Sequence, residues 1–340
     1  MKSPFTGGEA VLRQEWRTMD FRKESFTIMY HYYVCKDTGE QFTDDTLDEV
    51  DLNQVYNQYR EKYGIPFPDE IKNIREQYEL PANKMAEVLG LGINVYRNYE
   101  AGEVPSVSNG RLLQLVKDPN EFKRLLEYSS KEFTPEELAK INKKLERALD
   151  DWDIFQHNYE IRLLGEKRPN QYNGYRIPHL EKAENMILFF SEKLKPFKTK
   201  MNKLLFYADF LHFRKTCFSI SGLTYKAIQM GPVPKNYGGL YDQAMENQYV
   251  STEIHDFGEY RGEQFIPTNQ KVFKEGLFSD SEKETLHTIT EFFKQTTVST
   301  IIEMSHEEEG WKKSVNEFSF ISYLYSFELK YPTLIQPSAP

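Results

Sequence analysis

The spacing of the hydrophobic residues changes along the chain, and this change constrains the fold most strongly. In residues 25–34 apolar and aromatic side chains alternate with others, as on a half-buried β-strand. Residues 9–18 are also rich in β-formers, so we expect an antiparallel pair. From Ile71 onward the apolar residues recur at helical spacing. A chain of 340 residues with such a switch favours several domains.

Glycine, proline and charged stretches divide the chain into four predicted segments. Residues 44–62 open with acidic side chains and read as a helix or a solvated loop. The predicted fold class is multi-domain, mainly α with small β elements. The expected domains are a β-rich module over 1–66, an all-α domain over 67–130, a helical linker over 131–178, and an α+β domain over 179–332.

The second half of the chain shows mixed periodicity. Thr134 and Pro135 resemble the start of a charged helix, and 165–178 has the composition of a linker. Beyond it we expect helices at 179–195, 200–215, 235–247, 280–295 and 298–304, with strands at 223–229, 249–256 and 263–267.

Composition and charge exclude several classes of protein. No stretch approaches the roughly 20 apolar residues that span a bilayer, the first residues hold no signal-peptide run, and two cysteines cannot build a disulfide framework. We therefore expect a cytoplasmic protein without membrane contact. The net charge is −9, and no segment is basic. This balance argues against coating nucleic acid by charge alone, although local patches could bind.

Residues 69–118 contain the strongest short constellation. An apolar-striped helix at 69–78 precedes a second helix starting near Pro81, and Gly90-Leu91-Gly92 leads into a third, INVYRNYE. Its polar face carries Asn94, Arg97 and Asn98, whose side chains can form paired hydrogen bonds with base edges. These three are the predicted DNA contacts. The alternative is that they solvate the outer face of a helical bundle.

The stretch GLGINVYRNYEAGEVPSVSNGRLLQLV resembles the recognition region of the zinc-ribbon/helix-turn-helix antitoxins. Asn94 and the Tyr99, Glu100 and Gly102 of a Tyr-Glu-x-Gly motif match that family. The family usually has Arg directly before the Tyr-Glu pair. Here Asn98 stands there and Arg97 comes one place earlier, so the resemblance implies a different operator sequence.

The same resemblance implies an N-terminal zinc ribbon, but the ligands are degenerate. The matching positions are Ser3, Thr6, Cys35 and Thr38, which leave one thiolate. Structural zinc needs four Cys or His ligands, so we expect no metal. The strands would then be held together by Trp16, Phe26, Tyr30 and Tyr32.

Residues 179–330 resemble the Panacea, or SocA-like, domain of antitoxins. The resemblance rests on KMNKLLFYADFLHFRKT (200–216), ISGLTYKAIQMGPVPKNYGGLYD (220–242) and MSHEEEGWKKS (304–314). It implies direct binding of a cognate protein toxin encoded by the adjacent gene.

Within these motifs the 200–216 helix should bury an apolar stripe and leave Asp209 and His212 within reach of each other on an adjoining face. The prolines of Gly231-Pro232-Val233-Pro234 predict a stiff turn. The residues predicted to bind the toxin are Tyr207, Asp209, His212, Tyr237, Tyr241, His306 and Trp311.

Asp209, His212, His306 and Glu307 could alternatively form a metal or acid-base site. No nucleophile elbow, phosphate-binding loop or zinc-protease motif accompanies them. The same four residues could instead be buried polar groups that stabilise the fold by hydrogen bonding to one another. We therefore expect no catalytic residues, metal or cofactor.

These observations predict an antitoxin that neutralises its toxin by binding and represses its own operon as a homodimer on operator DNA. Two alternatives stay open. One is a chaperone-like adaptor that no longer binds DNA, favoured by the acidic balance, and the other is an enzyme that reverses the toxin's modification.

Overall fold

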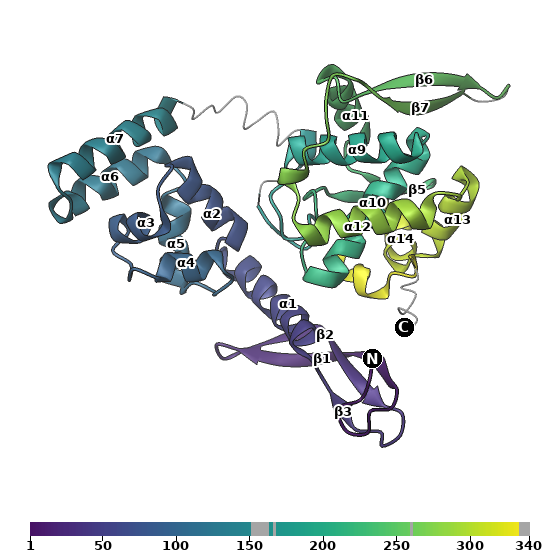
Figure 1. Ribbon diagram of the computed structural model, residues 1–340, viewed down its shortest axis with the longest axis horizontal. Coiled ribbons are helices and arrows are strands. Elements are labelled where there is room, and N and C mark those ends of the chain that lie inside the picture. The colour runs from purple at the N-terminus through teal and green to yellow at the C-terminus, as the bar shows by residue number, and fades with distance from the viewer. Residues whose placement is uncertain (151–162, 166–167, 259–260, 333–340) are drawn as a thin grey trace. The chain divides into compact units, whose positions relative to one another are not determined.

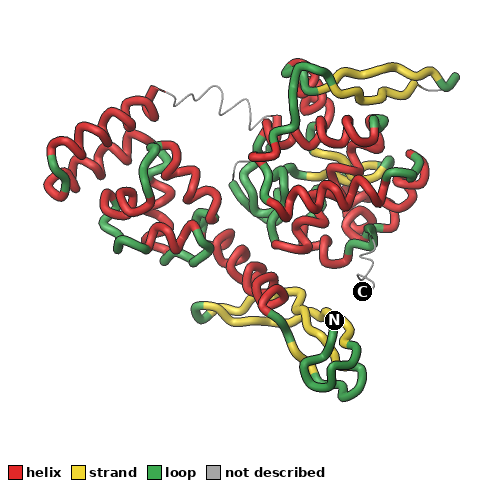
Figure 2. The backbone as a smooth tube through the Cα atoms, viewed as in Figure 1, coloured by secondary structure: helices red, strands yellow, loops and turns green. Residues whose placement is uncertain are grey.

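The computed structural model describes residues 1–150, 163–165, 168–258 and 261–332, which belong to two compact units, Met1–Asn158 and Tyr159–Pro340. Each unit is described by itself. Helices predominate in both, and the sheets are small and antiparallel (Figures 1 and 2). The predicted fold class, mainly α with small β elements, is confirmed at this level.

The N-terminal unit begins with a long β-hairpin. Strands β1 (Ala10–Phe21) and β2 (Glu24–Cys35) pair along their whole length, as predicted, and β3 (Gln41–Phe42) pairs with the end of β2. Arg22 and Lys23 form the connecting turn, and both have positive φ, which matches the twist of the two strands.

Helix α1 (Asp45–Tyr63) covers one face of this hairpin. The Asp44 carboxylate caps its start, and Gly64, at φ 63°, ends it. Phe26 and Ile28 pack against Val55 and Tyr59 of α1. The 44–62 segment is therefore a packed helix and not a solvated loop.

Trp16 does not stabilise the hairpin by burial, contrary to the prediction from the sequence. Trp16 is 52% exposed, whereas Phe26 is buried. Trp16 lies on β1, and α1 packs mainly against β2. Tyr30 and Tyr32 lie between these extremes and stack on each other. The hairpin is held mainly by α1, including Gln54, whose side chain bonds both the N–H and the C=O of Met29.

The rest of the unit is helical and has a core of its own. Tyr78, Met85, Tyr96 and Phe122 are among its buried residues. The elements are α2 (Pro68–Gln77), α3 (Ala82–Val88), α4 (Val95–Glu100), α5 (Val107–Leu115), α6 (Pro119–Ser129), the 3₁₀ turn η1 (Ser130–Glu132) and α7 (Pro135–Asp150). Helix α7 lies in the range expected to be a linker, yet Ile141 and Leu145 pack into this core.

The C-terminal unit is built around α10 (Lys198–Thr216). Every residue from Lys200 to Phe213 is buried, so the expected single apolar stripe is replaced by burial on all sides. Around it lie α9 (Leu180–Leu194), α11 (Tyr237–Glu246), α12 (Asp280–Phe293), α13 (Val298–Glu307), α14 (Glu309–Ser314) and the 3₁₀ turns η2 (Glu275–Leu277), η3 (Val315–Glu317) and η4 (Tyr323–Glu328). Figure 1 shows α10 between α9 and α12.

Two hairpins complete this unit. Strand β4 (Tyr225–Ile228) pairs with β5 (Gly231–Pro234), and β6 (Val250–Asp256) pairs with β7 (Arg261–Pro267). The Gly-Pro-Val-Pro segment is therefore an extended strand and not the predicted turn, which lies at Gln229 and Met230. Proline lacks the N–H that a central strand needs, but an edge strand tolerates it.

The segment expected to be a linker at 165–178 is irregular but packed where it is described. Asn173 and Tyr175 are buried, and the Ser219 hydroxyl donates to the Asn173 carbonyl at 2.8 Å. Gly174, at φ 62°, lies so close to Ser219 that a Cβ would stand 2.5 Å from its side chain. This segment is part of the C-terminal unit rather than a spacer.

Candidate functional sites

The α3–α4 pair exposes the three predicted DNA contacts. Asn94, Arg97 and Asn98 all face solvent. Helix α4 begins two residues later than predicted, at Val95, and Asn94 takes the N-cap position without a capping hydrogen bond. Gly90, at φ 64°, provides the left-handed residue of the connection between the two helices.

Contacts behind α4 fix the direction of its exposed face. The Tyr96 hydroxyl donates to the Ile71 carbonyl at 2.8 Å, and Asn109 donates to the Tyr99 hydroxyl at 2.8 Å. Arg75 holds Glu100 with two hydrogen bonds of 2.6 and 3.3 Å. The Tyr-Glu-x-Gly motif thus has a structural role, because its Tyr and Glu anchor α4 and Gly102 has a φ of 110°.

The charge near this face is modest. Lys84 of α3 donates to Glu87 at 2.9 Å and to Glu137 at 2.7 Å, so its charge is compensated within the unit. Arg97 is the basic residue that α4 contributes. Any DNA contact by this pair would rest on a few directional bonds more than on a broad basic patch.

The four positions that were matched to zinc-ribbon ligands in the sequence come together at one end of the hairpin. The Thr6 hydroxyl lies 3.6 Å from the Cys35 sulfur, and hydrogen bonds from Ser3, Thr38 and Thr6 lower the pKa of the Cys35 thiol to about 6. No group of three or more potential metal-ligating side chains occurs within the described ranges. The donors at Cys35 are hydroxyls, which do not fit structural zinc.

The two turns that carry these positions have the same backbone pattern. Ser3 accepts from the N–H of Gly7 and donates to the carbonyl of Gly8. Cys35 likewise accepts from Gly39 and donates to Glu40. Gly7 and Gly39 both have a φ of 75°. The two turns therefore have the same backbone hydrogen-bonding pattern. Ser3 and Thr6 occupy the same places in the first turn as Cys35 and Thr38 do in the second.

In the C-terminal unit, Asp209 of α10 is a buried hub and not a surface group. Its carboxylate accepts hydrogen bonds from the N–H groups of Ile220 and Ser221, from the Ser221 hydroxyl and from the Tyr225 hydroxyl, at 2.5–2.8 Å. Burial raises its pKa, and the four donors oppose that rise. This arrangement ties the loop after α10, and the start of β4, to the central helix.

His212 is engaged separately. Its Nδ1 lies 2.7 Å from the Phe218 carbonyl and its Nε2 lies 3.2 Å from the Ser281 hydroxyl. Burial lowers its pKa to about 4, so the ring is neutral at pH 7. The contact expected between Asp209 and His212 is replaced by these different partners, because the two side chains serve different neighbouring segments.

A second buried polar group lies beneath β5. The Lys203 ammonium is fully buried and donates to the Pro232 carbonyl at 3.1 Å. Burial lowers its pKa to about 7. Gly231 approaches so closely that a Cβ would stand 2.4 Å from the Ser305 hydroxyl and 2.7 Å from a Lys203 carbon. The Gly-Pro-Val-Pro motif is thus shaped by its contact with α10 and α13.

The residues predicted to bind a toxin fall into two groups, one buried and one partly exposed. Tyr207, Asp209, His212 and Tyr241 are at most 2% exposed, so their side chains offer a partner no surface in this structure. Tyr237, His306 and Trp311 are partly exposed. The Trp311 ring stacks on His306 at 4.0 Å, and its N–H donates to the Ile228 carbonyl at 2.8 Å.

Exposed apolar side chains also lie on the β4–β5 turn and on the segments next to this hairpin, and sequence periodicity did not single them out. Residues 319–321 run antiparallel to β4, with Phe320 opposite Lys226, which places Phe318 opposite Ile228 and near the β4–β5 turn. Tyr172 lies against Phe320. We call this surface the hairpin patch, and its members are 40–52% exposed: Tyr172, Met230, Phe318 and Phe320.

The C-terminal unit carries a recognisable family signature. Residues 201–312, about a third of the chain, match the family model described as the antitoxin SocA-like Panacea domain. The match begins on α10 and ends on α14, so it includes Asp209, Lys203 and both hairpins, and it does not extend to residues 1–200. No curated protein and no solved structure matches the chain.

The prediction of no membrane contact is tested only for helices. Within the part of the chain that the structure describes, no helix combines the length and the apolar composition needed to cross a bilayer.

Proposed function

We propose that this protein is an antitoxin that neutralises a toxic partner protein by direct binding through its C-terminal unit. The observation that carries the proposal is the match of residues 201–312 to the SocA-like Panacea antitoxin family. The hairpin patch supports binding as the mode of action, because exposed aromatic and Met side chains gathered around one hairpin are typical of the centres of protein interfaces. The product of the adjacent gene is the first partner to test.

The buried polar groups support binding over catalysis. Asp209 accepts four hydrogen bonds from its own unit, and His212 is neutral at pH 7 and bonded at both ring nitrogens. Such groups have little freedom to exchange protons with a substrate. The proposal therefore assigns them to the stability of the fold.

Neutralisation is tested by co-expression with the product of the neighbouring reading frame. We expect induced toxicity to be relieved and the two proteins to co-purify at fixed stoichiometry. The double variant Met230→Asp, Phe320→Asp should fold and lose both effects. Val272→Asp is the matched control, since Val272 is 80% exposed in the same unit and lies outside the patch. Rescue without a complex would favour the enzymatic alternative.

We further propose that the α3–α4 pair acts as a helix-turn-helix and represses the protein's own promoter, as a dimer on paired half-sites. The exposure of Asn94, Arg97 and Asn98 on a helix anchored by Tyr96, Tyr99 and Glu100 supports this role. Asn and Arg side chains offer the paired hydrogen bonds that read adenine and guanine.

A gel shift with the promoter fragment tests this second role. The variant Asn94→Ala, Arg97→Ala should lose the specific shift, whereas Lys123→Ala should keep it. Lys123 is an exposed lysine of α6, so its replacement removes the same charge as that of Arg97. Absence of any shift at low salt, with neutralisation intact, would favour the adaptor that does not bind DNA, the alternative consistent with the net charge of −9.

A further inference from the structure

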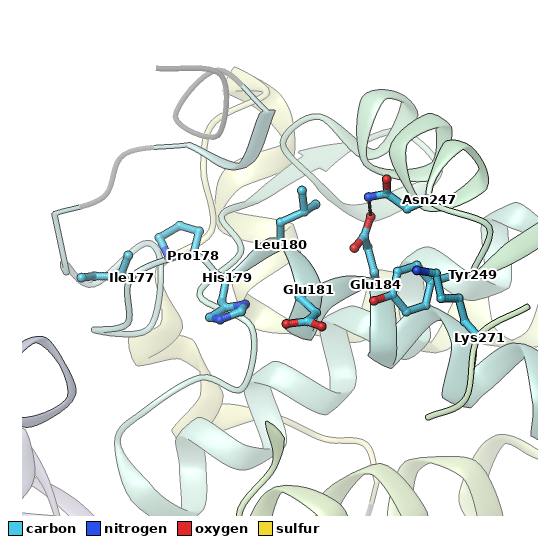
Figure 3. A pocket seen from close by; sticks show the side chains of 9 residues that line it. All are labelled: Ile177, Pro178, His179, Leu180, Glu181, Glu184, Asn247, Tyr249 and Lys271. Carbon is cyan, nitrogen blue, oxygen red and sulfur yellow. Dashed lines mark hydrogen bonds between the residues drawn. The ribbon is translucent and has the colours of Figure 1, made fainter. Parts of the chain in front are cut away.

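A cavity of about 590 Å³ opens beside the first half of α9 and belongs to none of the sites described above. In Figure 3 the side chains of Glu181 and Glu184 project from α9 between His179 and Tyr249. Three segments supply its walls. They are the start of α9, the end of α11 and the chain after β7, with lining residues Ile177, Pro178, His179, Leu180, Glu181, Glu184, Asn247, Tyr249 and Lys271.

Glu184 is the buried acid of this cavity. It is 2% exposed, and the Asn247 amide donates to one of its oxygens at 2.6 Å. Across the described ranges, no lysine or arginine nitrogen lies within 4.0 Å of its carboxylate. A carboxylate buried without a cationic partner is costly, since one amide replaces little of the lost hydration. The cavity therefore favours positive charge close to Glu184.

The neighbouring lysines have other partners than the Glu184 carboxylate. Lys274 pairs with Glu181 at the cavity rim. The Lys271 ammonium lies 5.3 Å from the centre of the Tyr249 ring, a cation–π position. Tyr249 thus already presents an aromatic face on which a cation rests. Ile177, Pro178 and Leu180 line the other side, where an aliphatic stem would find apolar contacts.

We propose that this cavity binds a guanidinium or primary ammonium group on an aliphatic stem, with Glu184 as the counter-ion and Tyr249 as the aromatic wall. The inference is independent of the antitoxin role. The ligand could be a free amine or an arginine side chain of another protein, because both present the same chemistry to the site.

Binding should depend on the charge of Glu184. Burial raises its pKa to about 7. Of the groups that face it, Glu181 raises this pKa further, while the Asn247 amide and the Lys271 charge lower it. His179, Tyr249 and Lys274 complete the surroundings. Because the cation needs the ionised form, affinity should rise about tenfold between pH 6 and pH 8.

The test titrates the full-length protein calorimetrically with agmatine and with acetyl-Gly-Arg-Gly-amide. The same peptide with citrulline in place of arginine is the neutral control. We expect both cationic probes to saturate, and to bind about tenfold more tightly at pH 8 than at pH 6, while the citrulline peptide does not bind. Tighter binding of agmatine would indicate a free amine as the natural ligand, and tighter binding of the peptide an arginine side chain.

Three variants decide the residue assignment. Glu184→Gln keeps the size of the side chain and should weaken binding at least about tenfold and abolish the pH dependence. Glu192→Gln, at an exposed glutamate of the same helix, should bind like the parent. Lys271→Gln should strengthen binding, since it removes the competing cation.

Three results would overturn the proposal. These are no saturation by either cationic probe, equal binding of the arginine and citrulline peptides, or unchanged binding by a Glu184→Gln variant whose thermal unfolding matches that of the parent.

Discussion

Gly231 occupies the place where β5 passes closest to α10 and α13. Its φ of 92° is a conformation that other L-residues avoid, and an added Cβ would meet the Ser305 hydroxyl at 2.4 Å. The same Cβ would stand 2.7 Å from a Lys203 carbon, and the buried Lys203 ammonium donates to the next carbonyl, that of Pro232. The glycine therefore allows a lysine to be buried with a hydrogen bond.

We predict that Gly231→Ala destabilises the C-terminal unit by about 2 kcal/mol or more, from backbone strain and overpacking together. Gly238→Ala is the matched control. Gly238 lies in α11 with nothing within 4 Å of the added Cβ, so alanine there should stabilise by about 0.5–1 kcal/mol. Urea unfolding of both variants measures the difference. Equal stabilities would contradict the assigned close contact.

Cys35 differs from an ordinary thiol because three hydroxyl side chains surround its sulfur. The hydrogen bond from Ser3 is the largest cause of the lowered pKa, followed by that from Thr38. The thiolate therefore favours the native state. Its contribution is complete above the ordinary pKa of 9 and is lost as the pH falls through about 6.

The pH dependence of thiolate absorbance at 240 nm, with the Cys35→Ala variant as the blank, measures this pKa. We expect a midpoint near pH 6 and a shift toward higher pH in Ser3→Ala. The stability of the parent relative to Cys35→Ala should rise between pH 6 and pH 9. A titration midpoint near pH 9 would show that the hydroxyl groups do not lower the pKa of the Cys35 thiol.

At the scale of elements, contacts with neighbouring helices and strands determine the secondary structure of short segments. Helix α4 has six residues, too few to be stable alone, and is held by Ile71, Arg75 and Asn109 from α2 and α5. The strand β5 contains two prolines and still pairs with β4, because the prolines occupy an edge. Local propensity predicted helix α4 to within two residues of its start, but it predicted a turn where strand β5 lies.

The matching turns at Ser3–Gly8 and Cys35–Glu40 share one backbone pattern and bring Ser3, Thr6 and Thr38 to the Cys35 sulfur. We predict that the triple variant Ser3→Cys, Thr6→Cys, Thr38→Cys binds one zinc ion per chain, since four thiolates would then converge. Elemental analysis after dialysis measures the metal. Adding Cys35→Ser to the triple variant should weaken binding strongly, and the parent should carry none.

A folded triple variant that contains no zinc would show that the four side chains do not converge as tetrahedral ligands. The spectrum after cobalt substitution distinguishes a tetrahedral thiolate site from adventitious binding to exposed cysteines.

At the scale of the whole molecule, each unit has its own hydrophobic core. The N-terminal unit has two clusters, one between α1 and the hairpin, which includes Ile65 and Val104, and one among α2–α7. The Arg60 side chain of α1 donates to the Gly102 carbonyl that follows α4. In the C-terminal unit the core surrounds α10. Both units bury enough apolar residues to fold as domains.

We predict that fragments 1–158 and 159–340 each fold and unfold cooperatively. The second fragment should relieve toxicity without binding DNA, and the first should bind the promoter fragment without relieving toxicity. Circular dichroism on heating and the two functional assays measure these outcomes. Loss of cooperative unfolding in either fragment would mean that its core needs the other half of the chain.

The sequence by itself determined the periodic elements: the β1–β2 hairpin, most of the helices and the β6–β7 hairpin, because spacing and turn chemistry are local properties. The Panacea resemblance, which rests on residues 200–216, 220–242 and 304–314, was also readable and is confirmed over 201–312. The sequence also singled out Ser3, Thr6, Cys35 and Thr38 as one set, and the structure brings these positions together.

Only the tertiary structure decided which polar side chains are buried. Asp209 and Tyr237 look equally eligible for a binding surface in the sequence, yet one accepts four internal hydrogen bonds and the other is partly exposed. The Glu184 cavity is assembled from three segments that lie between Ile177 and Lys271 in the sequence. Burial and long-range contact depend on how distant segments pack, and no local pattern encodes them.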